Sequence, residues 1–361
     1  NHCFLFLYLN NSILIIMVKK LIVINPRGFC AGVEMAIKAL TWMIKLFPKP
    51  IYCYHEIVHN DWIVEVFKKN GVIFVESPSE IPKGAISMLS AHGTSPDVKN
   101  LFISESSFVI DSVCPLVTKV HHEAKNLSEK KSNIIYIGHK GHDEAIGAMG
   151  VSPDSMTLIE SPDDLDNFVP NDPNNVSLLA QTTLAMSEWE TILQKSKILY
   201  PNLITPRKSD LCYATTNRQL AVKAIAENVD TIIVVGSSTS SNTNALVNTV
   251  NEYNTHSLRI NSVDELRACP TLQGDIAITA GASAPDHIVD QIIEEINPET
   301  IEVFTNTNEE EYFPLPVELR KIHKNLDLFL NHIFPLAKNT QGDIDISNDK
   351  DWTATDALNE L

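Results

Sequence analysis

Three cysteines that lie far apart in the sequence share one local pattern, and this pattern constrains the fold more than any other feature of the chain. Each follows an apolar, strand-like run and precedes a stretch with apolar residues at helical spacing: Cys30 follows residues 21–24, Cys114 follows 108–110, and Cys212 follows 203–204. In open α/β sheets, ligands bind beyond the carboxyl ends of the strands, where such turns lie. Helix N-terminal amides also stabilise a thiolate. The pattern therefore predicts an α/β fold with a thiolate-rich site.

Further apolar runs alternate with helical stretches, which predicts mainly parallel βαβ layers. The expected strands are residues 51–54, 72–75, 86–89, 134–137, 176–179, 231–235 and 276–279. The order of these elements predicts three small α/β domains, over residues 17–114, 115–208 and 209–300, and a closing segment over 301–320. We interpret residues 1–16 as a non-native or mis-started extension. Residues 321–361 are expected to form an acidic, partly disordered tail with one short helix over 326–333.

The six cysteines stand at positions 3, 30, 53, 114, 212 and 269, and no two of them form a CxxC pair. In a chain this long, such spacing indicates neither a disulfide scaffold nor a zinc site. Cys3, Cys53 and Cys269 lack the strand–turn–helix setting of the other three. We therefore interpret them as residues that bind no metal.

Charge and hydropathy exclude several classes of partner. The chain contains 28 Lys and Arg against 45 Asp and Glu, a formal net charge of −17. Such a surface repels nucleic acids and acidic membranes, so an anionic ligand needs a local pocket. The apolar runs near the start of the chain are interrupted at residues 10–12 and are far shorter than the roughly 20 residues that span a bilayer. We expect a cytoplasmic protein with neither a nucleic-acid nor a membrane partner.

Hydroxyl, amide and imidazole side chains gather directly after many of the expected strands. These clusters lie at residues 55–60, 90–93, 138–144, 180–183, 236–244 and 280–286. Small polar donors of this kind can surround a phosphate, whose oxygens accept hydrogen bonds from every side. The chain has neither a GxxxxGK[ST] loop nor a GxGxxG fingerprint, so a P-loop or Rossmann nucleotide site is not indicated. The clusters predict a pocket for a small phosphate ester or diphosphate.

The cysteines in the three turns and the polar residues after the strands also have a purely structural explanation. A single cysteine at a strand end is more often a small buried hydrophobe than a ligand. Ser240, Ser241 and Asn242 could cap the helix that follows them, and Glu144 could be a first-turn glutamate favoured by the helix dipole. Periodicity and spacing alone therefore indicate an α/β enzyme with a thiolate-rich site and an anion pocket.

The motifs themselves carry a more specific resemblance. They read NPRGFCAGV at 25–33, HEIVHN at 55–60, SAHG at 90–93, CPLVTKVH at 114–121, GHKGHDE at 138–144, QTTL at 181–184, CYATTNR at 212–218, SSN at 240–242 and TAGASAPD at 279–286. In this order the chain closely resembles the 4-hydroxy-3-methylbut-2-enyl diphosphate reductase family of the non-mevalonate isoprenoid pathway. The resemblance extends over about residues 18–320.

The resemblance implies a trefoil of three similar α/β domains with mainly parallel sheets around a central iron–sulfur site. The cluster ligands of the family fall on Cys30, Cys114 and Cys212, which leaves one iron of a [4Fe–4S] cluster without a protein thiolate. The residues that bind the diphosphate and the rest of the substrate fall on His59, His92, His142, Thr182, Ser240, Ser241, Asn242 and Ser283. The proton-delivering carboxylate falls on Glu144, with Thr182 as its hydroxyl partner and His142 beside the substrate.

The reaction implied by the resemblance is a reductive dehydroxylation that yields isopentenyl and dimethylallyl diphosphate. Two electrons pass through the cluster, and Glu144 and Thr182 relay a proton to the oxygen that leaves as water. The diphosphate holds the substrate in a reactive geometry. A ferredoxin or a flavodoxin is expected to supply the electrons, because the chain has no flavin or nicotinamide motif.

Asp143 is the main departure from the family pattern, because a proline is common between the residues equivalent to His142 and Glu144. The aspartate places another charge near the expected proton donor.

Two other functions compete with the reductase: a cluster-based sensor of isoprenoid diphosphates or oxygen without turnover, and a metal-free phosphate-binding or hydrolytic protein. Neither requires the three cysteine turns together with Glu144 and Thr182.

Overall fold

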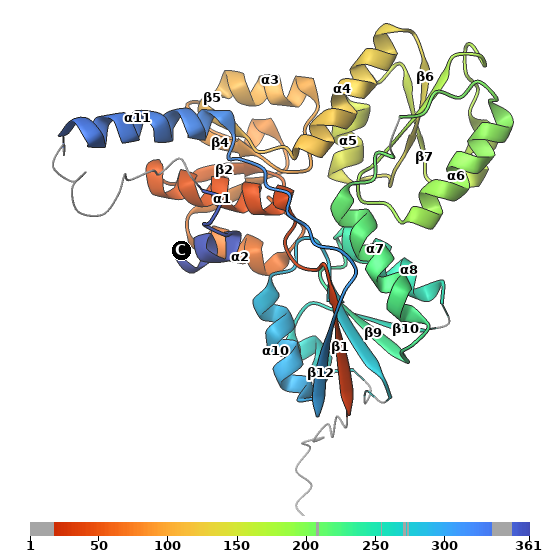
Figure 1. Cartoon of the computed structure of the whole chain (residues 1–361). Helices are drawn as coiled ribbons and strands as arrows, with labels where there is room; N and C mark the ends of the chain where they lie inside the picture. The colour runs from red at the N-terminus through yellow and green to blue at the C-terminus, as the bar shows by residue number, and fades with distance from the viewer. Residues whose placement is uncertain (1–17, 207–208, 254, 270–271, 273, 334–348) are drawn as a thin grey trace, which may run out of the picture.

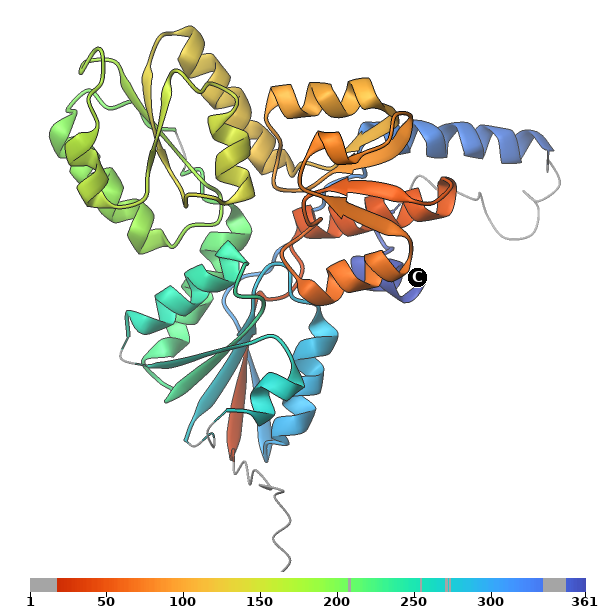
Figure 2. The same cartoon turned by 180° about the vertical axis from the view of Figure 1, so that it is seen from behind.

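The structure of the protein, a computed structural model, describes residues 18–206, 209–253, 255–269, 272, 274–333 and 349–361. Three α/β lobes surround a common centre, as both views show (Figure 1, Figure 2). Each lobe contains one parallel sheet flanked by helices. The predicted extension, residues 1–16, lies outside the described residues.

The first lobe has the sheet order β3-β2-β4-β5. Its strands are β2 (Ile51–Tyr54), β3 (Val72–Val75), β4 (Ala85–Leu89) and β5 (Ser106–Asp111), and its helices are α1 (Ala31–Leu46), α2 (Asp61–Lys69), η1 (Pro78–Glu80) and α3 (Pro96–Glu105). Buried apolar side chains at helical spacing on α1, among them Ile37, Leu40 and Met43, pack on this sheet. This spacing is what makes the segment an amphipathic helix with one face in the core.

The second lobe has the sheet order β7-β6-β8. Its elements are α4 (Pro115–Glu129), β6 (Asn133–Ile137), α5 (Asp143–Met149), β7 (Met156–Ile159), η2 (Pro162–Asn167), β8 (Val176–Ala180) and α6 (Met186–Leu199). Every residue of β8 is buried, as expected for a strand covered on both faces.

The third lobe has the sheet order β10-β9-β11-β1-β12. Its elements are β1 (Lys20–Asn25), α7 (Tyr213–Ala226), β9 (Thr231–Val235), α8 (Ser241–Asn251), β10 (His256–Ile260), α9 (Val263–Arg267), β11 (Ile276–Ala280), α10 (Asp286–Ile296) and β12 (Thr300–Thr305). Strand β1 was expected in the first domain, residues 17–114, but it lies between β11 and β12, where Leu21 pairs with Ile276. The side chains on its two faces pack into two different hydrophobic cores of this lobe. An apolar run predicts a buried strand, but it does not predict with which distant strands it pairs.

Three strands were not expected from the sequence: β7, β10 and β12. All three are edge strands of their sheets. These three strands are partly exposed, carry polar residues and lack the continuous apolar run of a buried parallel strand. The opposite error occurs at residues 203–204, where only an isolated bridge joins Ile204 to Ser177. Cys212 therefore follows a loop after α6 rather than a strand.

The C-terminal tail is more ordered than predicted. Helix α11 (Val317–Ile333) is longer than the expected 326–333, and residues 349–361 pack on α1 through the short helix α12 (Ala354–Asn359). The C-terminus thus lies beside α1 and α2 (Figure 1). Residues 334–348, which fall within the tail expected to be partly disordered, lie outside the described residues.

A buried ion pair fastens the tail to α1. The Lys38 ammonium lies 3.0 Å from the carboxylate of Asp349 and donates a hydrogen bond to its carbonyl oxygen at 2.8 Å. Both side chains are less than 5% exposed. Removing one partner of such a pair leaves an uncompensated buried charge, which costs more than the pair itself contributes.

We expect Asp349→Ala to lower the free energy of unfolding by about 3 kcal/mol, because it leaves the Lys38 charge buried without its carboxylate. Chemical denaturation measures this change. As the control, Lys38→Met in the same background should recover most of the loss. Equal stability of wild type and Asp349→Ala would show that the tail is not fastened at this point.

No helix in the described part of the chain is both long and apolar enough to cross a membrane.

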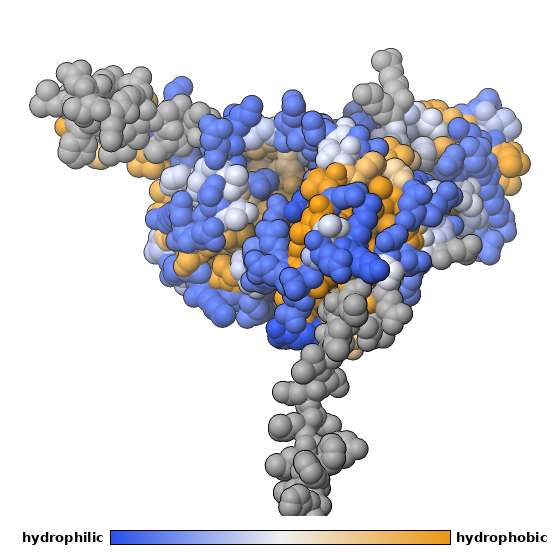
Figure 3. All heavy atoms as spheres, turned by 60° about the horizontal axis from the view of Figure 1, so that its bottom comes forward, coloured by the Kyte–Doolittle hydropathy of each residue, from blue (hydrophilic) through white to orange (hydrophobic). Residues whose placement is uncertain are grey.

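The end of the third lobe that lies at the bottom of Figure 1 shows hydrophobic residues interspersed with hydrophilic ones (Figure 3). Edge strand β12 contributes exposed Ile301 and Val303, which are 53% and 64% exposed.

Candidate active site

The three cysteines of the sequence pattern occupy equivalent positions in the structure. Cys30, Cys114 and Cys212 are the N-cap residues of α1, α4 and α7. The first-turn amides of each helix, which have no partner within the helix, therefore surround a cysteine. Cys212 uses them directly, because its sulfur accepts a hydrogen bond from the amide of Thr215 at 3.3 Å.

Each cysteine is also fixed through its own backbone amide, and the three amides bond in a repeated way. Cys30 donates to the carbonyl of Ala282 at 3.2 Å, Cys114 to Ala91 at 3.0 Å, and Cys212 to Thr182 at 3.0 Å. These carbonyls belong to the loops after β11, β4 and β8. Two of them directly precede Ser283 and His92, and the third belongs to Thr182 itself. The same bonds therefore hold the cysteine turns and the expected substrate loops together.

Gly32 keeps the space between two of the sulfurs open. A Cβ atom at this position would lie 2.9 Å from Sγ of Cys114 and 3.9 Å from Sγ of Cys30. Burial, and then the neighbouring Cys30, raise the pKa of the Cys212 thiol to about 11. The same two causes raise the pKa of Cys114. The cavity thus opposes the ionisation of Cys114 and Cys212 unless positive charge enters with a ligand.

All the site residues expected from the sequence line one cavity at the meeting point of the three lobes. They are Cys30, Cys114, Cys212, His59, His92, His142, Glu144, Thr182, Ser240, Ser241, Asn242 and Ser283. The other described cysteines, Cys53 and Cys269, do not line it, and Cys3 lies outside the described residues.

Glu144 and Thr182 form a buried pair across the second lobe. The carboxylate accepts hydrogen bonds from the Thr182 amide at 2.7 Å and from its hydroxyl at 3.0 Å. Burial raises the pKa of Glu144 to about 7, although both hydrogen bonds act in the opposite direction. Near neutral pH the carboxyl group therefore exists in both forms, as a proton donor requires.

His142 has a defined tautomer when it is neutral. Its Nδ1 accepts a hydrogen bond from the amide of Glu144 at 3.1 Å, so its proton lies on Nε2. Burial lowers the pKa of His142 to about 4. This ring therefore acts as a neutral donor through Nε2.

His59 and His92 stack on one another, with ring centroids 4.1 Å apart and an angle of 18° between the planes. Nε2 of His59 and Nδ1 of His92 are buried and have no hydrogen-bond partner. Buried ring nitrogens without partners are costly, so they indicate an interaction that a ligand completes.

The N-terminus of α8 supplies the expected hydroxyl and amide groups. Ser240 caps the helix, and Ser241 accepts a hydrogen bond from the side chain of Gln181 at 3.0 Å. Asn242 accepts from the amide of Ala282 at 2.9 Å through its side-chain oxygen. The alternative that these residues cap a helix is thus correct for Ser240, and this role is compatible with anion binding because free amides remain at the helix end.

Ser283 is already engaged within the protein. Its hydroxyl donates to the carbonyl of His59 at 3.0 Å, and its own carbonyl accepts from Asn60 at 3.0 Å. To donate to a ligand, this hydroxyl must rotate away from His59.

Sequence reasoning missed the side chains that tie the cysteine turns to one another. Arg218, 1% exposed, donates to the carbonyl of Gly28 at 3.0 Å and pairs with Glu309 at 3.2 Å. The Tyr213 hydroxyl accepts from the amide of Ala31 at 3.2 Å. These contacts join the turn that holds Cys212 to the turn that holds Cys30 across more than 180 positions of sequence.

Asp210 makes the equivalent connection to the second lobe. It accepts from the amide of Ala180 at 3.1 Å and pairs with Lys119 at 3.3 Å. Tyr213, Arg218 and Lys119 lie in the motifs at 114–121 and 212–218, and Asp210 lies beside Cys212. Neither signal distinguishes a connecting residue from any other residue near the site.

The comparisons with known proteins agree with this geometry. The family model described as LytB protein matches residues 21–297 of the chain. The chain belongs to the LytB family. It is similar to the 4-hydroxy-3-methylbut-2-enyl diphosphate reductase of Aliivibrio salmonicida, with 41% identity over 308 residues that cover 83% of this chain and 98% of that protein. The protein of that name from Streptomyces avermitilis is 40% identical over 309 residues, covering 84% and 91%.

A solved structure is also similar over most of the chain. The E-1-hydroxy-2-methyl-but-2-enyl-4-diphosphate reductase from Plasmodium falciparum matches with a TM-score of 0.80 and 34% identity, over 86% of this chain and 99% of that one. These findings confirm the reductase family and the three-lobed, mainly parallel α/β fold that were expected from the sequence.

Proposed function

We propose that this LytB-family enzyme reduces 4-hydroxy-3-methylbut-2-enyl diphosphate to isopentenyl and dimethylallyl diphosphate. The names of its relatives support the substrate. The observation that carries the proposal is that three cysteine thiols and the buried Glu144–Thr182 pair line the same cavity. One cavity can thus accommodate a redox centre, a proton donor and an anion.

A [4Fe–4S] cluster fits the donor set at the thiol end of the cavity. Cys30, Cys114 and Cys212 would hold it, and Gly32 leaves space beside two of the sulfurs. When bound, such a cluster supplies electrons and, at the iron without a protein thiolate, a Lewis-acid site. Among the described residues that line the cavity, no further cysteine is present to occupy that iron.

The opposite part of the cavity suits the diphosphate. His142 offers a neutral N–H donor, and His59 offers a buried ring nitrogen, Nε2, that has no hydrogen-bond partner in the protein. His92 lines the same cavity. Ser240, Ser241 and Asn242 add hydroxyl and amide groups at the N-terminus of α8, and Ser283 adds a hydroxyl from the loop after β11. Holding the diphosphate here fixes the hydroxyl end of a five-carbon substrate near the thiols and Glu144.

Glu144 and Thr182 are the proposed proton path. A protonated Glu144 can donate to the Thr182 hydroxyl, which donates its own proton onward, because a hydroxyl group both accepts and donates. The leaving oxygen departs as water. In balance, one C–O bond breaks and one C–H bond forms, with the uptake of two electrons and two protons. A ferredoxin or flavodoxin is the proposed electron source, and the cytoplasmic location stays a prediction.

The direct test is an anaerobic assay with the substrate and a strong artificial reductant. We expect both five-carbon diphosphates as products. A cluster-containing protein that binds the substrate without forming either product would contradict the proposal and favour a sensor.

The pH profile of the same assay tests the role of Glu144. We expect kcat/KM to fall as the pH rises through about 7, because only the protonated carboxyl group donates. In kcat the decline should lie at higher pH, since the negative charge of bound diphosphate further favours the protonated form. A kcat/KM that is constant from pH 6 to pH 9 would exclude Glu144 as the donor.

A further inference from the structure

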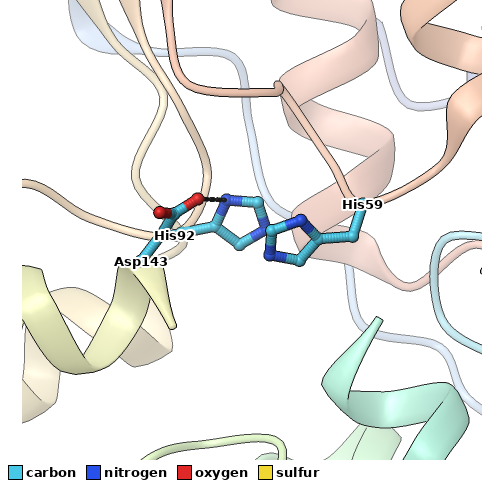
Figure 4. A group of neighbouring side chains, drawn as sticks. All are labelled: His59, His92 and Asp143. Carbon is cyan, nitrogen blue, oxygen red and sulfur yellow. Dashed lines mark ion pairs between the residues drawn. The ribbon is translucent and has the colours of Figure 1, made fainter. Parts of the chain in front are cut away.

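Asp143, the residue that departs from the family pattern, lies among the histidines expected to bind the diphosphate. It is the first residue of α5 and is 17% exposed. One carboxylate oxygen lies 2.6 Å from Nδ1 of His55, and the other lies 3.7 Å from Nδ1 of His92. Figure 4 shows His92 with Asp143 on one side and His59 stacked on the other.

His55 and Asp143 form an ion pair before any ligand binds. Burial opposes a charge on His55, but the hydrogen bond and charge of Asp143 prevail and raise its pKa. Burial likewise opposes the carboxylate, but the bond from His55 prevails and lowers the pKa of Asp143. The other groups at His55 are the ring of Tyr54, 3.9 Å away between centroids, and Glu76, 3.6 Å from Nε2. Asp143 is thus already neutralised and does not simply repel an anion.

His92 is neutral in the free protein, and its surroundings explain why. Burial is the largest cause that lowers its pKa, followed by the nearby rings of His59, His142 and His55. The carboxylate of Asp143 lies beside the His92 ring. Nδ1 of His92 faces this carboxylate without a hydrogen bond, at a distance that a small rotation of the ring would shorten to hydrogen-bond length.

An imidazole that donates to a carboxylate through one nitrogen and to a phosphate through the other must carry two protons. A bound diphosphate supplies the negative charge that favours this second proton. Asp143 can accept a hydrogen bond from Nδ1 of His92 and so orient the ring with Nε2 toward the ligand. Carboxylates orient the histidines that bind metals in the same way.

We propose that Asp143 is a positioning residue of this site: when an organic diphosphate binds, His92 takes up a proton and, as an imidazolium, donates through Nδ1 to Asp143 and through Nε2 to the ligand. This inference rests on the proposed function, which places the diphosphate beside His92.

A divalent cation is the competing ligand, because the nitrogens of His59 and His92 and an oxygen of Asp143 lie within 4.8 Å of one another. The ring geometry argues against it. Nitrogen lone pairs lie in the ring planes, and two rings stacked at 18° cannot direct them at one ion. One oxygen of Asp143 is also already bonded to His55. The arrangement suits an anion that contacts the two rings along their edges.

The test is calorimetric titration of the anaerobic, cluster-containing enzyme with isopentenyl diphosphate at pH 7.5, in two buffers of different ionisation enthalpy. A phosphate ester has its last pKa near about 6, so the ligand itself exchanges little proton there. Glu144, whose pKa is about 7, can also gain protons when the diphosphate binds, but this contribution is common to wild type and Asp143→Asn. We therefore expect wild type to take up about one proton per ligand more than Asp143→Asn, which should also bind about tenfold more weakly, since it loses a charged hydrogen bond.

Two further variants complete the test. Asp97→Asn makes the same change in the first turn of α3, away from the cavity, and should behave as wild type. His92→Gln should lose the same proton relative to wild type, which keeps the inference testable if Asp143→Asn does not fold. Proton uptake equal to that of wild type in His92→Gln or Asp143→Asn, or tighter binding by Asp143→Asn, would overturn the inference while leaving the proposed function intact. If wild type binds no isopentenyl diphosphate, the proposed function itself fails.

Discussion

Replacing Cys114 with serine is expected to give a colourless protein that retains its fold but holds less than about one iron per chain and forms no product. Serine has nearly the same shape as cysteine, and the amide of residue 114 can still donate to Ala91. What is lost is a thiolate, which is the ligand that iron–sulfur clusters require. Iron and sulfide analysis under anaerobic conditions, with the product assay, measures both effects.

Cys269→Ser is the matched control. Cys269 follows α9 and does not line the cavity, and its thiol donates a hydrogen bond to the carbonyl of Glu265. This variant should retain the iron content and activity of wild type. If Cys114→Ser retains a full complement of iron and its turnover, Cys114 is not a ligand, and the equivalence of the three cysteine turns has no functional meaning.

Glu144→Gln is expected to retain the cluster and bind substrate normally, but to turn over about 10²- to 10⁴-fold more slowly. The amide can still accept from the Thr182 backbone, so the loop keeps its position. The glutamine side chain has no acidic proton, so the proposed path through the Thr182 hydroxyl has no proton donor. Single-turnover kinetics with the reduced protein separates this step from substrate binding.

The stability of the same variant gives a check that does not depend on activity. The carboxyl pKa is about 7 in the folded protein and 4.5 is its usual value, so the folded state holds the extra proton between these pH values. Wild type should therefore lose about 3 kcal/mol relative to Glu144→Gln as the pH rises from about 4.5 to about 7.

Glu129→Gln makes the same chemical change on an exposed residue at the end of α4, and it should affect neither turnover nor stability. Wild-type turnover by Glu144→Gln would remove Glu144 from the proton path. A stability difference that does not vary with pH would mean that the carboxyl group has an ordinary pKa in the folded protein.

Those features of the fold that depend on local patterns could be predicted from the sequence. The three cysteine turns are local, since each combines an N-cap residue with the apolar periodicity of the helix that follows. The sheet to which β1 belongs is not local, because Leu21 pairs with a residue about 250 positions away. Edge strands such as β12 were missed because partial exposure replaces their apolar residues with polar ones.

The candidate site divides in the same way. Residues that directly follow strands, such as His92 and Thr182, could be anticipated because the carboxyl ends of parallel strands gather ligands. Contacts between lobes could not. Arg218 reaches Gly28 across 190 positions, and Asp143 reaches His55 across two lobes. Neither pairing produces a periodic pattern in the sequence, because each depends on how the folded lobes pack against one another.

The proposed function depends on three thiols from three turns sharing one metal centre. The most direct measurement is the iron and sulfide content of the wild-type chain after anaerobic reconstitution, combined with mass-spectrometric detection of alkylated cysteines. We predict about four irons and four sulfides per chain, with Cys30, Cys114 and Cys212 protected from alkylation while Cys269 reacts. A chain without iron, in which all three cavity cysteines react as readily as Cys269, would contradict the account.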